Sequence, residues 1–210
     1  MFVIFLTALA ISFSGTMMPG PLLTYTIKQS LNNGPHAGFI ITAGHAVLEI
    51  IIIALIFMGF DMILQSNSAQ ISIGIIGGLS LIYMGSEMIF SSLKNRVKIE
   101  LDNNKSSGRN MLLSGMVISA ANPYFLLWWA IIGLGFLLQA YKAFGTAGVF
   151  VFYLGHISAD LIWYGMISII VGTTRKFIKE YLYRIVIIVL GCLLIFFGGG
   201  FFYKAIIILI

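Results

Sequence analysis

Two acid–imidazole pairs are the residues of this chain whose types and spacing could do chemistry. His45 precedes Glu49 by four positions, and His156 precedes Asp160 by four, so on a helix each pair shares one face. A histidine beside a carboxylate can take up and release a proton near neutral pH. The spacing therefore predicts two proton-coupling pairs. The alternative for each is a hydrogen bond between helices with a purely structural role.

Proline interrupts apolar sequence at two places. The first is Pro19-Gly20-Pro21 and the second is Asn122-Pro123. Proline removes a backbone donor and disrupts a helix, and in a membrane the freed groups need protein or a water-filled cavity beside them. We expect these residues to bind substrate through exposed helix ends. Packing kinks are the alternative.

Two aromatic residues follow Asp160 at helical spacing. Trp163 and Tyr164 lie three and four positions beyond it, which places them on the same helix face. They are expected to wall a substrate-binding cavity, and the alternative is that they are packing or membrane-facing aromatics.

The elements that position these residues are predicted to be transmembrane helices. The chain has 210 residues, of which 60% are hydrophobic and 9% charged, and its mean hydropathy is +1.03. Such a sequence cannot give a globule a polar surface, and about 20 apolar residues cross a bilayer. We expect an all-α membrane protein with six spans, over approximately residues 1–24, 37–60, 69–92, 110–138, 146–172 and 182–209.

An internal repeat organises these spans. Three short patterns recur in the same order, at offsets of 100, 111 and 113 residues: Phe13-Ser14-Gly15 with Leu113-Ser114-Gly115, Gly44-His45 with Gly155-His156, and Gly78…Gly85 with Gly191…Gly198. Three spans per repeat would place the halves upside down relative to each other, as in many secondary transporters. The prediction is one transmembrane domain over 1–210, with repeat 1 at about 1–92, a cytoplasmic loop at about 93–109 and repeat 2 at about 110–210. The first and fourth spans are expected to be broken at the proline motifs.

Basic residues predict the orientation. They concentrate in the loops after the odd-numbered spans, namely Lys28, then Lys94, Arg96, Lys98, Lys105 and Arg109, then Arg175, Lys176, Lys179 and Arg184. Only Lys142 and Lys204 fall on the other side. Because cytoplasmic loops carry the excess of Lys and Arg, both termini are expected on the extracytoplasmic side of a plasma (inner) membrane protein. The net charge of +5 is thereby explained without a nucleic-acid partner.

Several function classes are excluded by what the sequence lacks. The single Cys192 excludes disulfide frameworks and cysteine-rich metal clusters. No protease, esterase or ATP-binding motif is present, so we expect no enzyme activity and no cofactor.

The proline motifs and the Gly-His-x-x-x-acid motifs together resemble the lysine exporter (LysE/RhtB-type) family of amino-acid exporters, over nearly the whole chain. The resemblance implies six spans, export of an amino acid driven by the proton gradient, and a homodimer. Family members often have a basic residue directly after the Asn-Pro of the fourth span, where this chain has Tyr124.

The functional hypothesis is a proton-coupled exporter of small amino acids or their analogues, working by alternating access at a site in mid-membrane. Its partners would be the amino acid, protons and the lipid bilayer. The alternative is a divalent metal cation exporter, because two His/carboxylate pairs on facing helices could supply the four ligands of a metal site.

Overall fold

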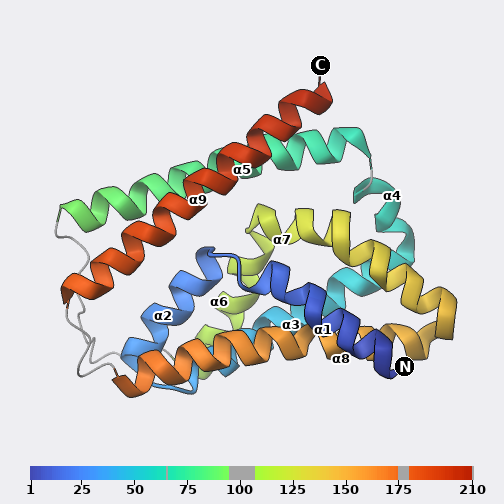
Figure 1. The fold of residues 1–210 in the computed structure, drawn as a ribbon, viewed down its shortest axis with the longest axis horizontal. Coiled ribbons are helices and arrows are strands. Elements are labelled where there is room, and N and C mark those ends of the chain that lie inside the picture. The colour runs from blue at the N-terminus through green and yellow to red at the C-terminus, as the bar shows by residue number, and fades with distance from the viewer. Residues whose placement is uncertain (65, 95–106, 175–179, 210) are drawn as a thin grey trace.

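The computed structural model describes residues 1–64, 66–94, 107–174 and 180–209, which contain helices and no strand. The predicted all-α class is confirmed. Figure 1 shows two layers of long helices, with α5 and α9 forming one side of the molecule and α1, α2, α3, α6 and α8 the other.

The first proline motif separates two helices. α1 spans Phe2–Thr16 and α2 spans Pro21–Asn33, and their axes are bent by 84°. Pro21 occupies the first turn of α2, where its missing N–H costs no hydrogen bond. α2 continues to Asn33, beyond the predicted end of the first span near residue 24.

A tight turn leads from α2 to the next helices. Gly34, with φ +93°, and Pro35 turn the chain into α3, Ala37–Leu55. A π-helical turn, η1 (Ile56–Phe60), and the short α4 (Asp61–Leu64) follow. α5, Asn67–Leu93, begins where the hydroxyl of Ser66 accepts a hydrogen bond from the backbone N–H of Ala69.

The remaining helices lie in the second half of the sequence. α6 spans Gly108–Ala120, and α7 spans Pro123–Trp128 with Asn122 as its N-cap, whose Oδ1 accepts from the N–H of Tyr124 at 3.1 Å. A π-helical turn, η2 (Trp129–Gly133), leads into α8, Leu134–Thr174. α8 has non-helical dihedral angles at Phe144 and Gly145, so it contains two helical segments. α9 spans Glu180–Leu209.

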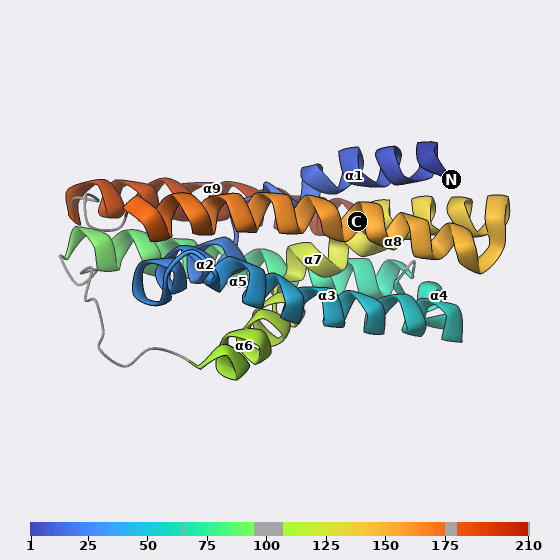
Figure 2. The same ribbon diagram turned by 90° about the horizontal axis from the view of Figure 1, so that it is seen from below.

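Three helix pairs make the main contacts: α1 with α8, α3 with α6, and α5 with α9. Glycine allows the close approach, as small residues do between membrane helices. A Cβ on Gly44 of α3 would collide with the backbone of Leu112 in α6, and a Cβ on Gly115 of α6 with that of Ile41 in α3. Figure 2 shows α6 inclined to the other helices, and Figure 1 shows α9 running at an angle to α8 and α1.

By length and hydropathy, four of the described helices can cross a membrane, and five if α1 and α2 form one bent span. The six predicted spans stay a prediction, because α6 and α7 are each short and α8 holds the end of the fourth predicted span together with the fifth. The loop residues Arg96, Lys98, Lys105, Arg175, Lys176 and Lys179, on which the predicted orientation depends, lie outside the described residues.

Candidate functional site

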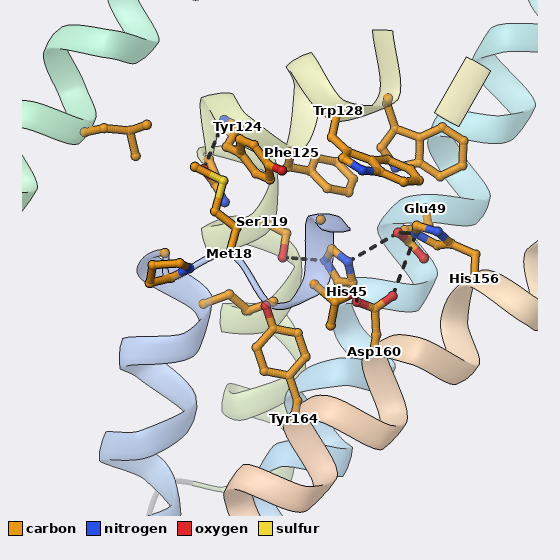
Figure 3. A pocket seen from close by; sticks show the side chains of 18 of the residues that line it. Met18, His45, Glu49, Ser119, Tyr124, Phe125, Trp128, His156, Asp160 and Tyr164 are labelled. Atoms are coloured by element: carbon orange, nitrogen blue, oxygen red, sulfur yellow. Dashed lines mark hydrogen bonds and ion pairs between the residues drawn. The ribbon is translucent and has the colours of Figure 1, made fainter. Parts of the chain in front are cut away.

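A cavity lies where the two interrupted segments meet α3 and α8 (Figure 3). Its free volume is about 50 Å³, room for roughly three to five water molecules. Its walls include both histidines and both carboxylates of the sequence motifs, together with five aromatic residues, Tyr124, Phe125, Trp128, Trp129 and Tyr164.

Glu49 is the hub of the polar network. Its side chain is fully buried, and Oε1 lies 2.5 Å from Nε2 of His156 and 3.3 Å from Nε2 of His45. Its other oxygen, Oε2, has no hydrogen-bond partner among the described residues. One carboxylate oxygen thus faces two imidazoles from two helices, and the second is buried without a hydrogen-bond partner among the described residues.

Each histidine is hydrogen-bonded through its other ring nitrogen, Nδ1, to a serine hydroxyl. Nδ1 of His45 lies 2.7 Å from the hydroxyl oxygen of Ser119 on α6, and Nδ1 of His156 is hydrogen-bonded to Ser12 on α1. A serine hydroxyl can donate to a neutral imidazole or accept from an imidazolium. Either histidine can therefore gain a proton without losing a hydrogen bond.

Asp160 has a comparable arrangement. Its Oδ1 lies 2.7 Å from the hydroxyl oxygen of Thr16, which also lies 2.9 Å from the carbonyl oxygen of Ser12. The threonine has one proton, so it donates to the ionised Asp160, or it accepts from protonated Asp160 and donates to the carbonyl. Oδ2 of Asp160 has no hydrogen-bond partner among the described residues and lies 3.7 Å from Nε2 of His156.

Aromatic rings surround His156. The ring centroids of Trp128, Trp129 and Phe152 lie 4.8, 5.4 and 6.2 Å from that of the imidazole. The negative faces of aromatic rings favour a nearby cation. His45 has a single such neighbour in the described structure, Phe125, at 5.2 Å.

The contacts differ from the pairing that the spacing suggests. The shortest acid–imidazole contact joins Glu49 of α3 to His156 of α8, whereas the distances within each helix are 3.3 Å and 3.7 Å. Sequence spacing compares residues of one helix only, so it could not detect a contact between helices. The four side chains form one cluster rather than two pairs.

The other predicted site residues divide into two groups. Pro19, Gly20, Asn122 and Tyr164 line the cavity, and Pro21, Pro123 and Trp163 do not. Pro21 starts α2, Pro123 packs against Gly77 of α5, and Trp163 packs at the edge of the apolar cluster between α2, α3 and α9.

The residues that support the cluster were not predicted from the sequence. Ser12, Thr16 and Ser119 are buried and bond directly to the ionisable side chains. Their only signal in the sequence is a hydroxyl one or two turns before a proline motif, a pattern that many membrane helices share. Trp128 and Trp129 were not among the predicted site residues either.

Three of the clustered residues could hold a metal ion. A nitrogen of His45 and one carboxylate oxygen each of Glu49 and Asp160 lie within 4.8 Å of one another. This donor set of one nitrogen and two oxygens suits Zn²⁺ or Mn²⁺.

Buried ionisable residues around a cavity, in an apolar chain whose described residues form helices, are typical of a membrane transport protein, since such residues inside a bilayer mark a path for substrates or ions. The LysE type translocator family matches residues 13–205. The chain belongs to this family, as its sequence motifs predicted, and it is a multi-pass membrane translocator and not an enzyme.

Two relatives span nearly the whole chain. This chain is 25% identical over 181 residues to YcgF of Bacillus subtilis (strain 168), and the matched region covers 86% of each protein. YcgF is named as an amino acid efflux protein. The chain is 22% identical over 185 residues, covering 88% of this chain and 90% of the relative, to the chemotactic transduction protein ChpE of Pseudomonas aeruginosa. No solved structure matches significantly.

Proposed function

We propose that this protein is a secondary-active exporter of small amino acids or their analogues, coupled to protons, with its substrate site in the cavity around Glu49 and Asp160. The observation that carries the proposal is the pair of buried carboxylate oxygens, Oε2 of Glu49 and Oδ2 of Asp160, that have no hydrogen-bond partner among the described residues. An unpaired buried acceptor is costly, and a substrate ammonium group would satisfy both.

The size of the cavity favours a small substrate. Its volume of about 50 Å³ corresponds to roughly three to five water molecules, which is close to the space that a small amino acid needs. A long cationic amino acid would need more room. The helix start at Gly20 and Leu22, both in the cavity wall, offers backbone N–H groups in the manner of discontinuous transporter helices.

Proton coupling follows from the chemistry of the cluster. A substrate ammonium and a proton compete for the same carboxylates, so binding of one favours release of the other. Because the hydroxyls of Ser12, Thr16 and Ser119 can reverse their hydrogen bonds, both protonation states are accommodated by the same heavy-atom positions. His45, Glu49, His156 and Asp160 are the proposed proton-coupling residues, and Pro19, Gly20, Asn122 and Tyr164 the proposed binding residues.

The helix contacts support two inverted three-helix repeats. The matched glycines of α5 and α9 contact each other reciprocally: Gly78 meets Gly198, and Gly85 meets Gly191. Such exchanged contacts arise when two equivalent elements are related by a two-fold axis. The other two main contacts follow the same rule. The first predicted span of repeat 1 (α1) contacts the second of repeat 2 (α8), and the second of repeat 1 (α3) contacts the first of repeat 2 (α6). Alternating access would then be a rocking of one repeat against the other.

We place the protein in the plasma (inner) membrane, with both termini on the extracytoplasmic side, on the distribution of Lys and Arg over the predicted loops. In this arrangement α1 and α2 form the first span, and α6, α7, η2 and the start of α8 form the fourth. A homodimer is part of the same proposal.

Cells fed with dipeptides test the function, because peptide hydrolysis raises the internal amino-acid concentration. Cells that express the protein are expected to release more of one small amino acid than cells that lack it. A Glu49→Gln/Asp160→Asn double variant should abolish the difference. Glu87→Gln is the matched control, since Glu87 is an exposed carboxylate of α5. Equal release from cells with and without the protein would contradict the proposal.

Export of a divalent metal ion is the second candidate, favoured by the ligand atoms of His45, Glu49 and Asp160. It predicts that the purified protein retains Zn²⁺ or Mn²⁺ and that its expression raises metal tolerance. The proposed amino-acid exporter predicts neither result.

A further inference from the structure

We propose that the indole N–H of Trp129 binds the carboxylate of the transported amino acid and makes the site selective for amino acids over simple amines. The inference rests on the proposed function and deepens it. Two carboxylates can attract the ammonium group of any amine, so a separate donor is needed to recognise the negative end of a zwitterion.

Trp129 is the fully buried aromatic residue of the cavity wall, with 0% of its surface exposed. Its Nε1 atom has no hydrogen-bond partner among the described residues. Buried indole N–H groups usually find a partner, so a donor left unpaired in a cavity wall points to an acceptor that arrives with the ligand.

Two other side-chain donors of the cavity wall, on α7, are already engaged. The indole N–H of Trp128 donates to the hydroxyl oxygen of Ser14 at 3.3 Å, and the hydroxyl of Tyr124 donates to the carbonyl oxygen of Ser14 at 3.0 Å. These contacts tie α7 to α1 and leave Trp129 as the unpaired indole of the wall.

The position of Trp129 suits a ligand that also reaches the carboxylates. Its ring centroid lies 5.4 Å from that of His156, and Nε2 of His156 lies 2.5 Å from Glu49 and 3.7 Å from Asp160. The imidazole of His156 thus lies beside the indole ring and beside both acids. The ammonium and carboxylate of an α-amino acid are attached to the same carbon, so one small molecule can meet both ends of this arrangement.

Trp129 is the first residue of the π-helical turn η2 (Trp129–Gly133), and π-turns occur frequently at functional sites.

Ligand binding to the purified full-length protein tests the proposal. Each of the twenty common amino acids is titrated alone, and the tightest is compared with its decarboxylated amine. Trp129→Phe is expected to weaken amino-acid binding on the order of 10- to 100-fold, the effect of losing one hydrogen bond to a charged group, and to leave amine binding unchanged. Retained amine binding shows that the variant is folded.

Trp163→Phe is the matched control. Trp163 also has a buried Nε1 without a hydrogen-bond partner in the described part of the chain, but it does not line the cavity. Its replacement should change neither affinity. A benzothienyl analogue at position 129, which keeps the ring shape and removes the N–H, should reproduce the effect of Trp129→Phe.

The outcomes separate this inference from the function on which it rests. Unchanged amino-acid affinity in Trp129→Phe, or equal losses for amino acid and amine, would overturn the inference and leave the exporter in place. Absence of amino-acid binding to the wild-type protein would overturn both.

Discussion

The contact between Glu49 and His156 should be the strongest coupling in the polar cluster. Double-mutant cycles can measure it, with Glu49→Gln combined separately with His156→Gln and with His45→Gln. The same glutamate then reports on its two imidazole partners, one on α8 and the other on its own helix.

The expected magnitudes follow from the two distances. Interhelical couplings in a membrane protein average about 0.6 kcal/mol and reach about 1.7 kcal/mol. The Glu49–His156 contact is fully buried and 2.5 Å long, so we expect about 1.5 kcal/mol. The Glu49–His45 distance of 3.3 Å exceeds the usual range for an N–H···O hydrogen bond, so we expect about 0.5 kcal/mol or less.

Unfolding of the purified variants in mixed micelles, titrated with a denaturing detergent, gives the free energies of unfolding. A coupling with His45 as large as the coupling with His156 would refute the reasoning. It would mean that the pairing within one helix, as the sequence spacing suggests, describes the protein better than the contact between helices.

Three further predictions concern packing and support. Gly44→Ala would press a methyl group against the backbone of α6, so we expect strong loss of folded protein on size-exclusion chromatography, whereas Gly135→Ala, which meets open space, should be neutral. Thr16→Val removes the donor to Asp160 and should lower the free energy of unfolding by about 1–3 kcal/mol, with Thr16→Ser restoring most of it. Ser168→Ala leaves a buried backbone N–H of α3 without its acceptor and should cost about 1–3 kcal/mol in the same assay. An effect below 0.5 kcal/mol, on the order of a neutral surface change, would contradict either hydroxyl prediction.

Composition and spacing were sufficient to predict the class of fold and the ionisable residues of the cavity. A chain of this hydropathy has the bilayer as its solvent, so helices were the expected elements. A carboxylate or an imidazole within an apolar stretch is rare enough to be noticed, and all four such residues lie in one cluster.

Side-chain direction was harder to predict. Trp163 and Tyr164 lie on either side of Asp160 when α8 is viewed along its axis, because each residue turns the helix by about 100°. Tyr164 lines the cavity and Trp163 packs outside it, a choice that depends on where α2 and α9 lie. The sequence of one helix does not contain that information.

Hydrogen bonds between residues far apart in the chain could not be predicted either, because the sequence of one helix does not show which helices pack against it. Ser12 and Thr16 meet residues 144 positions away, and serine and threonine are common in helices of every environment. Trp129 also has no local signal, since its unpaired N–H is recognised only when the neighbours of the indole are known.

Transport into or out of sealed proteoliposomes under an imposed pH gradient tests the central claim most directly. The account predicts that the gradient drives movement of a small amino acid in the wild-type protein and in Glu87→Gln, and that Glu49→Gln/Asp160→Asn loses this movement. Gradient-driven transport by the double variant at the wild-type rate would contradict the claim that the buried acid–imidazole cluster couples protons to substrate.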